Sequence, residues 1–376
     1  MFNWLRNLAL FATTLLLLAL VVEKLVFGVL YLPSDLPVLQ ENNGGVLRYE
    51  SGQEGVYRIK DEIAGRFSIN NEGWNSSVDY FPNKESDLPR ICLIGDSMIE
   101  ALQVSVESHM ARVLEKELSD EVDSVYSFAL SGGPLSHYVY LLEHEVVRFN
   151  PDIVVIHLAS SDLIESVYPS VGAYPASLAR LRYQSTKESH FSHIDPSPYQ
   201  RDPISRIKST NAYRYLRVRE QLRLDWIKTV LLELFLREKN IGIDRVNEPS
   251  KAPEGEELTR GIAEVLMTKA VEVSKKGSFR LIFLVDGNRP EIYEAVDSGS
   301  VELPEASDLA KTVAEVGYDL GIEVLMLDRP FFEHYLNTRT KVNFELDLHW
   351  NEKGHQIAAT VLAKHIARNG QRDYSD

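Results

Sequence analysis

The chain has 376 residues, of which 44% are hydrophobic and 25% are charged, so it allows one large globular domain with insertions or two smaller ones. Its formal net charge of -15 would repel a phosphate backbone, and we therefore expect no nucleic-acid partner. Cys92 is the only cysteine, which excludes an intramolecular disulfide, and the apolar run around it predicts a small buried side chain. Neither CxxC nor HExxH spacing occurs, so no metal framework is indicated.

The N-terminal segment is apolar enough to enter a membrane. Residues Leu8 to Val22 carry no charge, Glu23 and Lys24 interrupt the run, and it resumes from Leu25 to Leu32. A spanning helix needs about 20 apolar residues, a length that the whole stretch reaches if the two charged residues lie near the interface. A cleaved signal peptide is the alternative, but no small-x-small cleavage pattern follows the run directly. We therefore expect an uncleaved, single-pass anchor.

The orientation of the anchor and the division of the chain follow from charge and composition. Arg6 and the amino terminus favour a cytoplasmic N-terminal end, so we expect the body on the periplasmic, extracytoplasmic side of the inner membrane. The predicted parts are the anchor with the start of a linker (1–34), the linker with a small β-element (35–89), a catalytic domain (90–370) with a cap insertion at about 163–277, and a C-terminal tail (371–376).

From Arg90 onward, short apolar runs alternate with helical periodicities. The apolar runs are Ile91–Ile94, Val125–Leu130, Ile153–Leu158, Leu281–Val285 and Val324–Leu327. Continuous apolar strands between helices predict an α/β fold with a parallel sheet covered on both faces. Ligands of such sheets bind at the carboxyl ends of the strands, so the loops after these runs are where chemistry is expected.

The insertion at 163–277 is read as a helical cap beside that edge. Its first part is irregular and rich in proline, and residues Asn211 to Lys239 predict one long amphipathic helix. An excess of lysine and arginine lies between Arg201 and Lys228 in this otherwise acidic chain. These cations are either the solvated face of the helix or a contact for anionic headgroups or an acidic polysaccharide.

The first candidate for chemistry is Gly95-Asp96-Ser97, directly after the first strand. Glycine permits a sharp strand-to-helix turn, and Ser97 then begins the next segment with its own N–H directed toward the site. Such an N–H can stabilise a developing oxyanion. A serine that merely caps a helix would produce the same tripeptide, so this motif alone does not decide between the two.

The second candidate is Asp347-Leu348-His349, near the C-terminus. Residues two apart in an extended segment share a face, so Asp347 and His349 can reach one site. A histidine beside a serine hydroxyl takes its proton during attack and returns it to the leaving group. A carboxylate on the other ring nitrogen fixes the tautomer of the histidine and stabilises its charged form. The simpler alternative is a loop histidine at the start of a helix.

Two further loops follow predicted strands and could hold an oxyanion. Gly132, after the second strand, leaves backbone N–H groups free to approach a ligand. Ser161, after the third strand, occupies a position where a side-chain donor would be expected. Either loop by itself is equally consistent with an ordinary turn.

In this order the four motifs resemble blocks I, II, III and V of the SGNH hydrolases, the GDSL-type lipases and acylhydrolases, over about Arg90 to Ala367. The resemblance implies a three-layer α/β/α fold with a five-stranded parallel sheet. It also implies Ser97 as nucleophile, Gly132 as an oxyanion donor, and Asp347 and His349 as the other members of a catalytic triad.

One position departs from the family pattern. The third block of the family is usually Gly-x-Asn-Asp, and its asparagine amide donates to the oxyanion, whereas this chain has Ser161 in that place. A serine hydroxyl is shorter and is not fixed by a planar amide, and losing one oxyanion donor costs roughly 10²–10³ in turnover. Ser161 is therefore a weaker donor, a donor acting through water, or a mark of reduced activity.

The segment from Ser68 to Gly73 and the Asp-x-His-Trp form also resemble envelope polysaccharide proteins, including alginate O-acetylation enzymes. This looser likeness implies an acylated glycan as substrate and envelope polysaccharide machinery as partner. We expect a serine esterase or O-acyltransferase that needs no metal or organic cofactor. The alternatives are an inactive, envelope-anchored glycan-binding or assembly protein with the same fold, and a lipid acylhydrolase. A polar groove with aromatic residues would favour a glycan, and an apolar slot would favour acyl chains.

Overall fold

A computed structural model of the chain describes residues 2–41, 45–159, 161–168, 178–184, 190–199, 205–222 and 256–370. The chain forms two compact units, each described separately below. The smaller unit comprises Met1–Leu36, Val56–Ala64 and Arg201–Glu248, and the larger one comprises Pro37–Gly55, Gly65–Gln200 and Pro249–Asp376.

The larger unit is built on a five-stranded sheet with the strand order β11-β10-β7-β5-β6. Its neighbouring strands are parallel throughout. The strands are β5 (Arg90–Gly95), β6 (Ser124–Ala129), β7 (Ile153–Leu158), β10 (Arg280–Val285) and β11 (Glu323–Met326). Every residue of β5, β6 and β7 is buried, as expected for strands covered on both faces. The five apolar runs of the sequence are these five strands, so the predicted sheet is confirmed.

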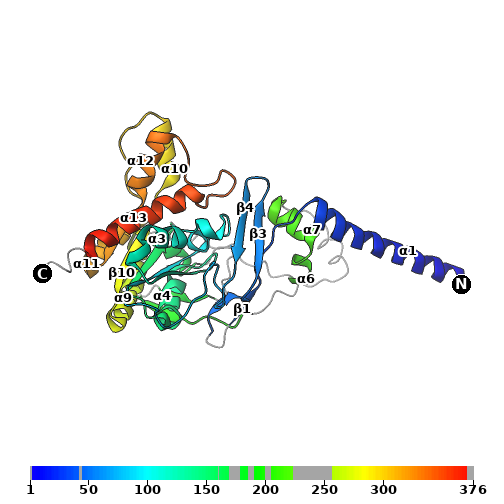
Figure 1. Ribbon diagram of the computed structural model, residues 1–376, viewed down its shortest axis with the longest axis horizontal. Helices are drawn as coiled ribbons and strands as arrows, with labels where there is room; N and C mark the ends of the chain where they lie inside the picture. The colour runs from blue at the N-terminus through cyan, green and yellow to red at the C-terminus, as the bar shows by residue number, and fades with distance from the viewer. Residues whose placement is uncertain are drawn as a thin grey trace. The chain divides into compact units, whose positions relative to one another are not determined.

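Helices cover both faces of this sheet and complete the predicted three layers (Figure 1). One face is covered by α4 (Leu135–His144), α9 (Glu256–Gly277) and α11 (Asp308–Leu320), and the other by α3 (Met110–Leu118), α10 (Arg289–Asp297), α12 (Asp328–Thr338) and α13 (Glu352–Gly370). Alternation along β5 feeds both cores, since Cys92 and Ile94 face the first layer while Ile91 and Leu93 face the second.

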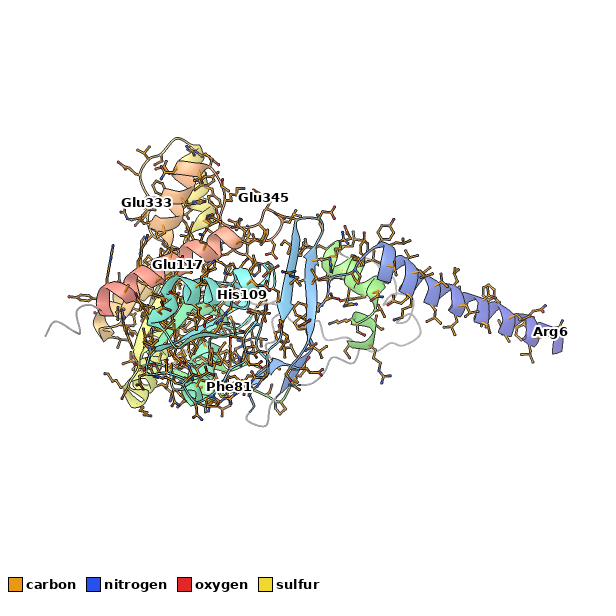
Figure 2. The ribbon with its side chains drawn as sticks, in the orientation of Figure 1. Arg6, Phe81, His109, Glu117, Glu333 and Glu345 are labelled. Carbon is orange, nitrogen blue, oxygen red and sulfur yellow. The ribbon has the colours of Figure 1, made fainter. Side chains whose placement is uncertain are left out.

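Polar contacts also join neighbouring helices of one layer. Glu117 of α3 accepts a hydrogen bond from the Thr360 hydroxyl of α13 at 2.6 Å, and Figure 2 shows Glu117 between these two helices. Short 3₁₀ turns lie beside α3 and α4: η2 (Val106–Ser108), η3 (Ser119–Glu121) and η4 (Val146–Phe149). The thiol of Cys92 is fully buried, and burial raises its pKa, so the prediction of an unreactive core residue is confirmed.

The strand order of the sheet reverses beside β5. From β5 the chain passes to β6 on one side, and then crosses back to β7 on the other side of β5. In open α/β sheets, ligands bind where the strand order reverses in this way. The residues that follow β5 therefore lie at the position where this topology favours a functional site.

The insertion between β7 and β10 contains more than the helices that the sequence predicts. Its described residues include α5 (Asp162–Glu165), an antiparallel pair of β8 (Arg180–Gln184) and β9 (His190–Ile194), and α6 (Ser205–Lys208). The pair β8–β9 was not predicted. The helix expected from Asn211 to Lys239 begins as α7 (Asn211–Tyr213) and continues as the π-helix η5 (Arg214–Arg219), and its remainder lies outside the described residues. Helix α9 falls inside the predicted range of the insertion, yet it covers the sheet.

The N-terminal segment of the smaller unit is helical throughout, as α1 (Phe2–Val21) and η1 (Val22–Leu30). Its portion Trp4–Leu30 has 27 residues, a mean hydropathy of 2.2 and no buried residues, so it is long and apolar enough to cross a membrane. At about 1.5 Å per residue it reaches roughly 40 Å, more than the ~30 Å of a bilayer core. A signal sequence at the same place would meet the same criteria.

Glu23, which interrupts the apolar run, caps a helix within the smaller unit. Its carboxylate accepts hydrogen bonds from the backbone N–H groups of Asn211 at 2.5 Å and Ala212 at 3.0 Å. These are N–H groups of the first turn of α7, which have no partner inside the helix and favour a negative charge. The charge of Glu23 is thus satisfied by α7.

Two cations of the basic segment between Arg201 and Lys228 are also used inside the smaller unit. Arg214 forms an ion pair with Asp35 at 2.8 Å, and Arg219 forms one with Asp61 at 2.9 Å. Arg201, Arg223 and Lys228 of the same segment lie outside the described residues. Arg214 and Arg219 thus have carboxylate partners within the protein itself.

The predicted β-element consists of two two-stranded sheets. One pairs β1 (Leu39–Glu41) with β2 (Leu47–Tyr49), and the other pairs β3 (Glu54–Ile59) with β4 (Ile63–Ser68). The segment after β4 packs into the larger unit, where Trp74 is fully buried against Phe128 with ring centroids 5.5 Å apart. Gly73 is required beside it, because its φ is +85° and a Cβ would lie 2.4 Å from the Tyr49 carbonyl oxygen.

Candidate active site

Ser97 is placed by the turn that follows β5. At Gly95 an added Cβ would lie 2.5 Å from the Ile99 side chain, so only glycine permits the next helix to start this close to the strand. The Asp96 carboxylate then accepts a hydrogen bond from the Met98 N–H at 2.9 Å and caps α2 (Ser97–Glu100). Ser97 is therefore the first residue of this short helix, directly after the strand beside which the strand order reverses.

His349 and Asp347 reach this serine from the other end of the chain. Nε2 of His349 lies 2.6 Å from Oγ of Ser97, and Nδ1 of His349 is hydrogen-bonded to Oδ1 of Asp347. Asp347 also accepts a hydrogen bond from the backbone N–H of His349 at 3.2 Å and one from the Gln103 amide at 3.4 Å. The structure thus brings the three residues together in the arrangement that a nucleophile, a base and an orienting carboxylate require.

The charges of this triad support one another. Burial lowers the pKa of His349, but the hydrogen bond and negative charge of Asp347 outweigh it, and the pKa of His349 is raised above its usual value. Burial raises the pKa of Asp347, and the hydrogen bond and charge of His349 reverse this, so the pKa of Asp347 is lowered. Asp347 therefore stays ionised at neutral pH, where its charge favours the protonated form of His349.

The two predicted oxyanion loops flank Ser97 along the edge of the sheet. Gly132 follows β6 and Ser161 follows β7, and these strands are the two neighbours of β5. The φ of Gly132 is +76°, a conformation that glycine adopts without strain. Ser161 is exposed, and its hydroxyl makes no hydrogen bond within the part of the chain that the structure describes. It is therefore available to donate to a ligand.

Glu100 is a buried residue of this region that the sequence analysis missed. It lies on the helix that Ser97 begins, is 2% exposed, and accepts hydrogen bonds from the Tyr49 hydroxyl at 2.5 Å and from the Ser131 hydroxyl. Asn75 donates to its backbone carbonyl at 2.8 Å. Burial raises the pKa of Glu100, against the effect of the Ser131 and Tyr49 hydrogen bonds. The only signal in the sequence was an acidic residue three positions after Ser97 in an otherwise apolar turn.

An ion pair at the end of β10, also missed, holds the segment that carries His349. Arg289 donates to the carbonyl oxygen of Leu348, and its other terminal nitrogen pairs with Asp286 at 2.8 Å. The second oxygen of Asp286 accepts a hydrogen bond from the Trp350 indole at 3.0 Å. The ion pair thus holds the Leu348 backbone and the Trp350 side chain, one on each side of His349.

Buried histidine side chains pack against Trp350, the residue after His349. The Trp350 ring contacts His157 and His355 edge-on, with centroids 4.9 Å and 5.5 Å apart, and His355 stacks on His109 at 6.1 Å. His109 precedes α3 (Figure 2). Burial lowers the pKa of His109 to about 4, and it also lowers the pKa values of His157 and His355. His355 is therefore a packing residue of α13.

A cavity of about 440 Å³ is lined in part by Leu348, the residue before His349. Most of its lining side chains are polar: Asp286, Gly287, Asn288, Arg289, Pro290, Tyr293, Ser307, Leu309, Lys341, Asn343, Glu345 and Leu348. One of them, Tyr293, is aromatic. Carbon atoms of these residues make up more of the inner surface than polar atoms do, so the cavity offers apolar surface with a few hydrogen-bonding groups, as small-ligand sites do.

Comparison with solved structures finds similar folds among acylhydrolases. An acetyl xylan esterase, AlAXEase, is 12% identical, with 74% of this chain and 99% of that chain covered and a TM-score of 0.40. A lipase/acylhydrolase from Enterococcus faecalis is 14% identical, with coverages of 74% and 95% and a TM-score of 0.38. A GDSL-like lipase from Bacteroides thetaiotaomicron is 10% identical, with coverages of 75% and 89% and a TM-score of 0.34.

One of these neighbours is described as GDSL-like, the type that the four sequence blocks resemble. No family model matches the chain. No curated protein matches it either. At these identities and TM-scores the likeness does not decide the chemistry of the site. That chemistry rests on the contacts of Ser97, His349 and Asp347 themselves.

Proposed function

We propose that the protein is a serine-dependent ester hydrolase or O-acyltransferase. The observation that carries this proposal is the chain of contacts from Ser97 through His349 to Asp347. The Ser97 oxygen attacks the ester carbonyl while Nε2 of His349 takes its proton, which gives a tetrahedral oxyanion. The C–O bond to the leaving alcohol then breaks, His349 returns the proton to that oxygen, and the acyl group stays on Ser97.

The second half of the reaction repeats these steps with a new hydroxyl. His349 takes a proton from water or from an acceptor hydroxyl, whose oxygen attacks the acyl-Ser97 carbonyl. The tetrahedral intermediate collapses, and His349 returns the proton to Ser97. We assign the oxyanion to the backbone N–H groups of Ser97 and Gly132, with the Ser161 hydroxyl as a third donor. The φ of Gly132 supports this assignment, as does the Ser161 hydroxyl, which makes no hydrogen bond to any residue that the structure describes.

The substrate that we propose is an O-acyl group, such as acetyl, on an extracytoplasmic glycan. The cavity beside Leu348 is lined by hydrogen-bonding side chains and by Tyr293, and these groups support a glycan as substrate. The apolar helix Trp4–Leu30 and the position of Arg6 support a membrane-anchored protein with this site outside the cytoplasm, near envelope polysaccharide machinery. The assembled triad disfavours an inactive binding protein, which would not need these three side chains in contact.

The test is acetate release from p-nitrophenyl acetate by the full-length protein in detergent, compared with Ser97→Ala and His349→Ala. Both substitutions should abolish the release, because each removes a group that moves a proton or forms a bond. Ser298→Ala, an exposed residue at the C-terminal end of α10, is the matched control and should leave it unchanged. Equal rates in all four proteins would reject an esterase. Adding a soluble glycan acceptor then separates transfer to sugar from release to water.

A further inference from the structure

The cavity beside Leu348 is lined by the residue that directly precedes the proposed base, His349. It is formed at the carboxyl end of β10 by the first turn of α10, the start of α11 and the segment from Lys341 to Leu348. Leu348 separates Asp347 from His349, and its side chain lines the cavity while its carbonyl binds Arg289. A ligand in this cavity would therefore contact the residue that lies between Asp347 and His349.

The charges around the cavity cancel in pairs. Arg289 is paired with Asp286 at 2.8 Å, and Lys341 is paired with Glu345 at 2.8 Å. A ligand that carried a formal charge would compete with the existing partner for one of these side chains. The new ion pair would replace an old one, so its net contribution to binding would be small. The cavity therefore favours an uncharged ligand.

The polar groups that remain suit hydroxyl groups. The half-buried Asn288 amide makes no hydrogen bond to any described residue, so it offers both a donor and an acceptor. The Ser307 hydroxyl oxygen accepts from the Ala310 N–H at 3.2 Å, and its hydrogen remains available. Leu348, which is 65% exposed, and the exposed Pro290 add apolar surface at the rim, where the C–H face of a sugar ring can lie.

We propose that this cavity binds an uncharged sugar residue of the glycan, next to the sugar residue that carries the ester at Ser97. The inference rests on the proposed function and adds a second sugar-binding position to it. The cavity of about 440 Å³ is within the range of small-ligand sites. Binding energy from a non-reacting part of the substrate then assists the reaction at the ester, so a simple ester should be a poorer substrate than an oligosaccharide.

The test compares kcat/KM for partially O-acetylated xylotriose with kcat/KM for p-nitrophenyl acetate in the full-length protein. Asn288→Leu removes the amide at similar size and should lower the ratio of the two values roughly 10-fold, the effect of one lost hydrogen bond. Asn288→Trp fills the cavity and should lower the ratio further. Asn337→Leu, on the exposed face of α12 outside the cavity, is the matched control and should leave the ratio unchanged.

A binding measurement separates failure of this inference from failure of the proposed function. Saturation-transfer NMR with unacetylated xylotriose should detect binding to Ser97→Ala, and Asn288→Trp in that background should abolish it. Two results in an active esterase would overturn the inference alone. One is a ratio that is unchanged from the parent protein in both Asn288 variants, and the other is a Ser97→Ala form that does not bind the trisaccharide. Trisaccharide binding that is lost on Asn288→Trp, in a protein without esterase activity, would keep the sugar site and reject the esterase.

Discussion

The carboxylate of Glu100 accepts a hydrogen bond from the Ser131 hydroxyl, so the helix that begins at Ser97 is tied to the turn that contains Gly132. The Tyr49 hydroxyl binds the other oxygen of Glu100 at 2.5 Å. The small β-element therefore takes part in fixing the distance between the proposed nucleophile and the proposed oxyanion donor. A buried acid with both oxygens occupied is costly to leave unpaired, which makes this connection rigid.

Replacing Glu100 should harm turnover more than substrate binding. In Glu100→Leu the hydroxyls of Tyr49 and Ser131 lose their buried acceptor, and we expect kcat to fall roughly 10–100-fold with a small change in KM, since small misplacements of reacting groups have effects of this size. Glu100→Gln keeps a polar partner for each hydroxyl and should recover most of the rate. A change in KM as large as the change in kcat, or no recovery of kcat in Glu100→Gln, would contradict the positioning role.

The pH dependence of ester hydrolysis should report His349. The imidazole acts as a base only when neutral, and its pKa is raised above the usual 6.5, so kcat/KM should rise with pH and reach half its maximum above pH 6.5. In Asp347→Asn the raising charge is gone and the tautomer is no longer fixed. We expect the plateau to fall roughly 10³–10⁴-fold. A half-maximum well below pH 6.5 in the parent protein would contradict this assignment.

Ser161 can be tested by restoring the family residue. We expect Ser161→Ala to lower kcat because a hydroxyl donor to the oxyanion is lost, and Ser161→Asn to raise it, by up to roughly 10² if the amide reaches the oxyanion fully. Ser161 is exposed, so neither change should alter stability, and thermal unfolding provides the check. Identical kcat values in all three proteins would remove Ser161 from the oxyanion site.

The buried imidazoles should make the fold sensitive to acid. The pKa of His109 is about 4 in the folded protein against 6.5 for an unperturbed histidine, so the unfolded chain binds more protons between these values. The contribution of His109 to the free energy of unfolding is at its full value above pH 6.5. It falls by about 1.4 kcal/mol per pH unit as the pH drops toward 4. His109→Gln should reduce this slope in denaturant unfolding followed at several pH values. An unchanged slope would contradict the buried neutral state.

The sheet and the triad could be predicted because each leaves a local signal. Strands such as β7 are continuous apolar runs, and Ser97 and His349 lie in short motifs whose order along the chain is specific. Glu100 and Arg289 act through partners far away in the sequence, Tyr49 and Leu348, and single long-range contacts produce no periodicity. The β8–β9 pair is local, and it was missed for another reason: its strands lie in a polar, proline-rich stretch that gives little strand signal.

The most direct test of the central claim is covalent labelling of the full-length protein with a fluorophosphonate probe, followed by mass spectrometry of the modified peptide. If Ser97 is a nucleophile activated by His349, the probe adds to Ser97 alone, and both His349→Ala and prior heat denaturation prevent the labelling. Absence of labelling in the folded parent protein, or equal labelling in His349→Ala, would contradict the claim that these contacts form a working catalytic triad.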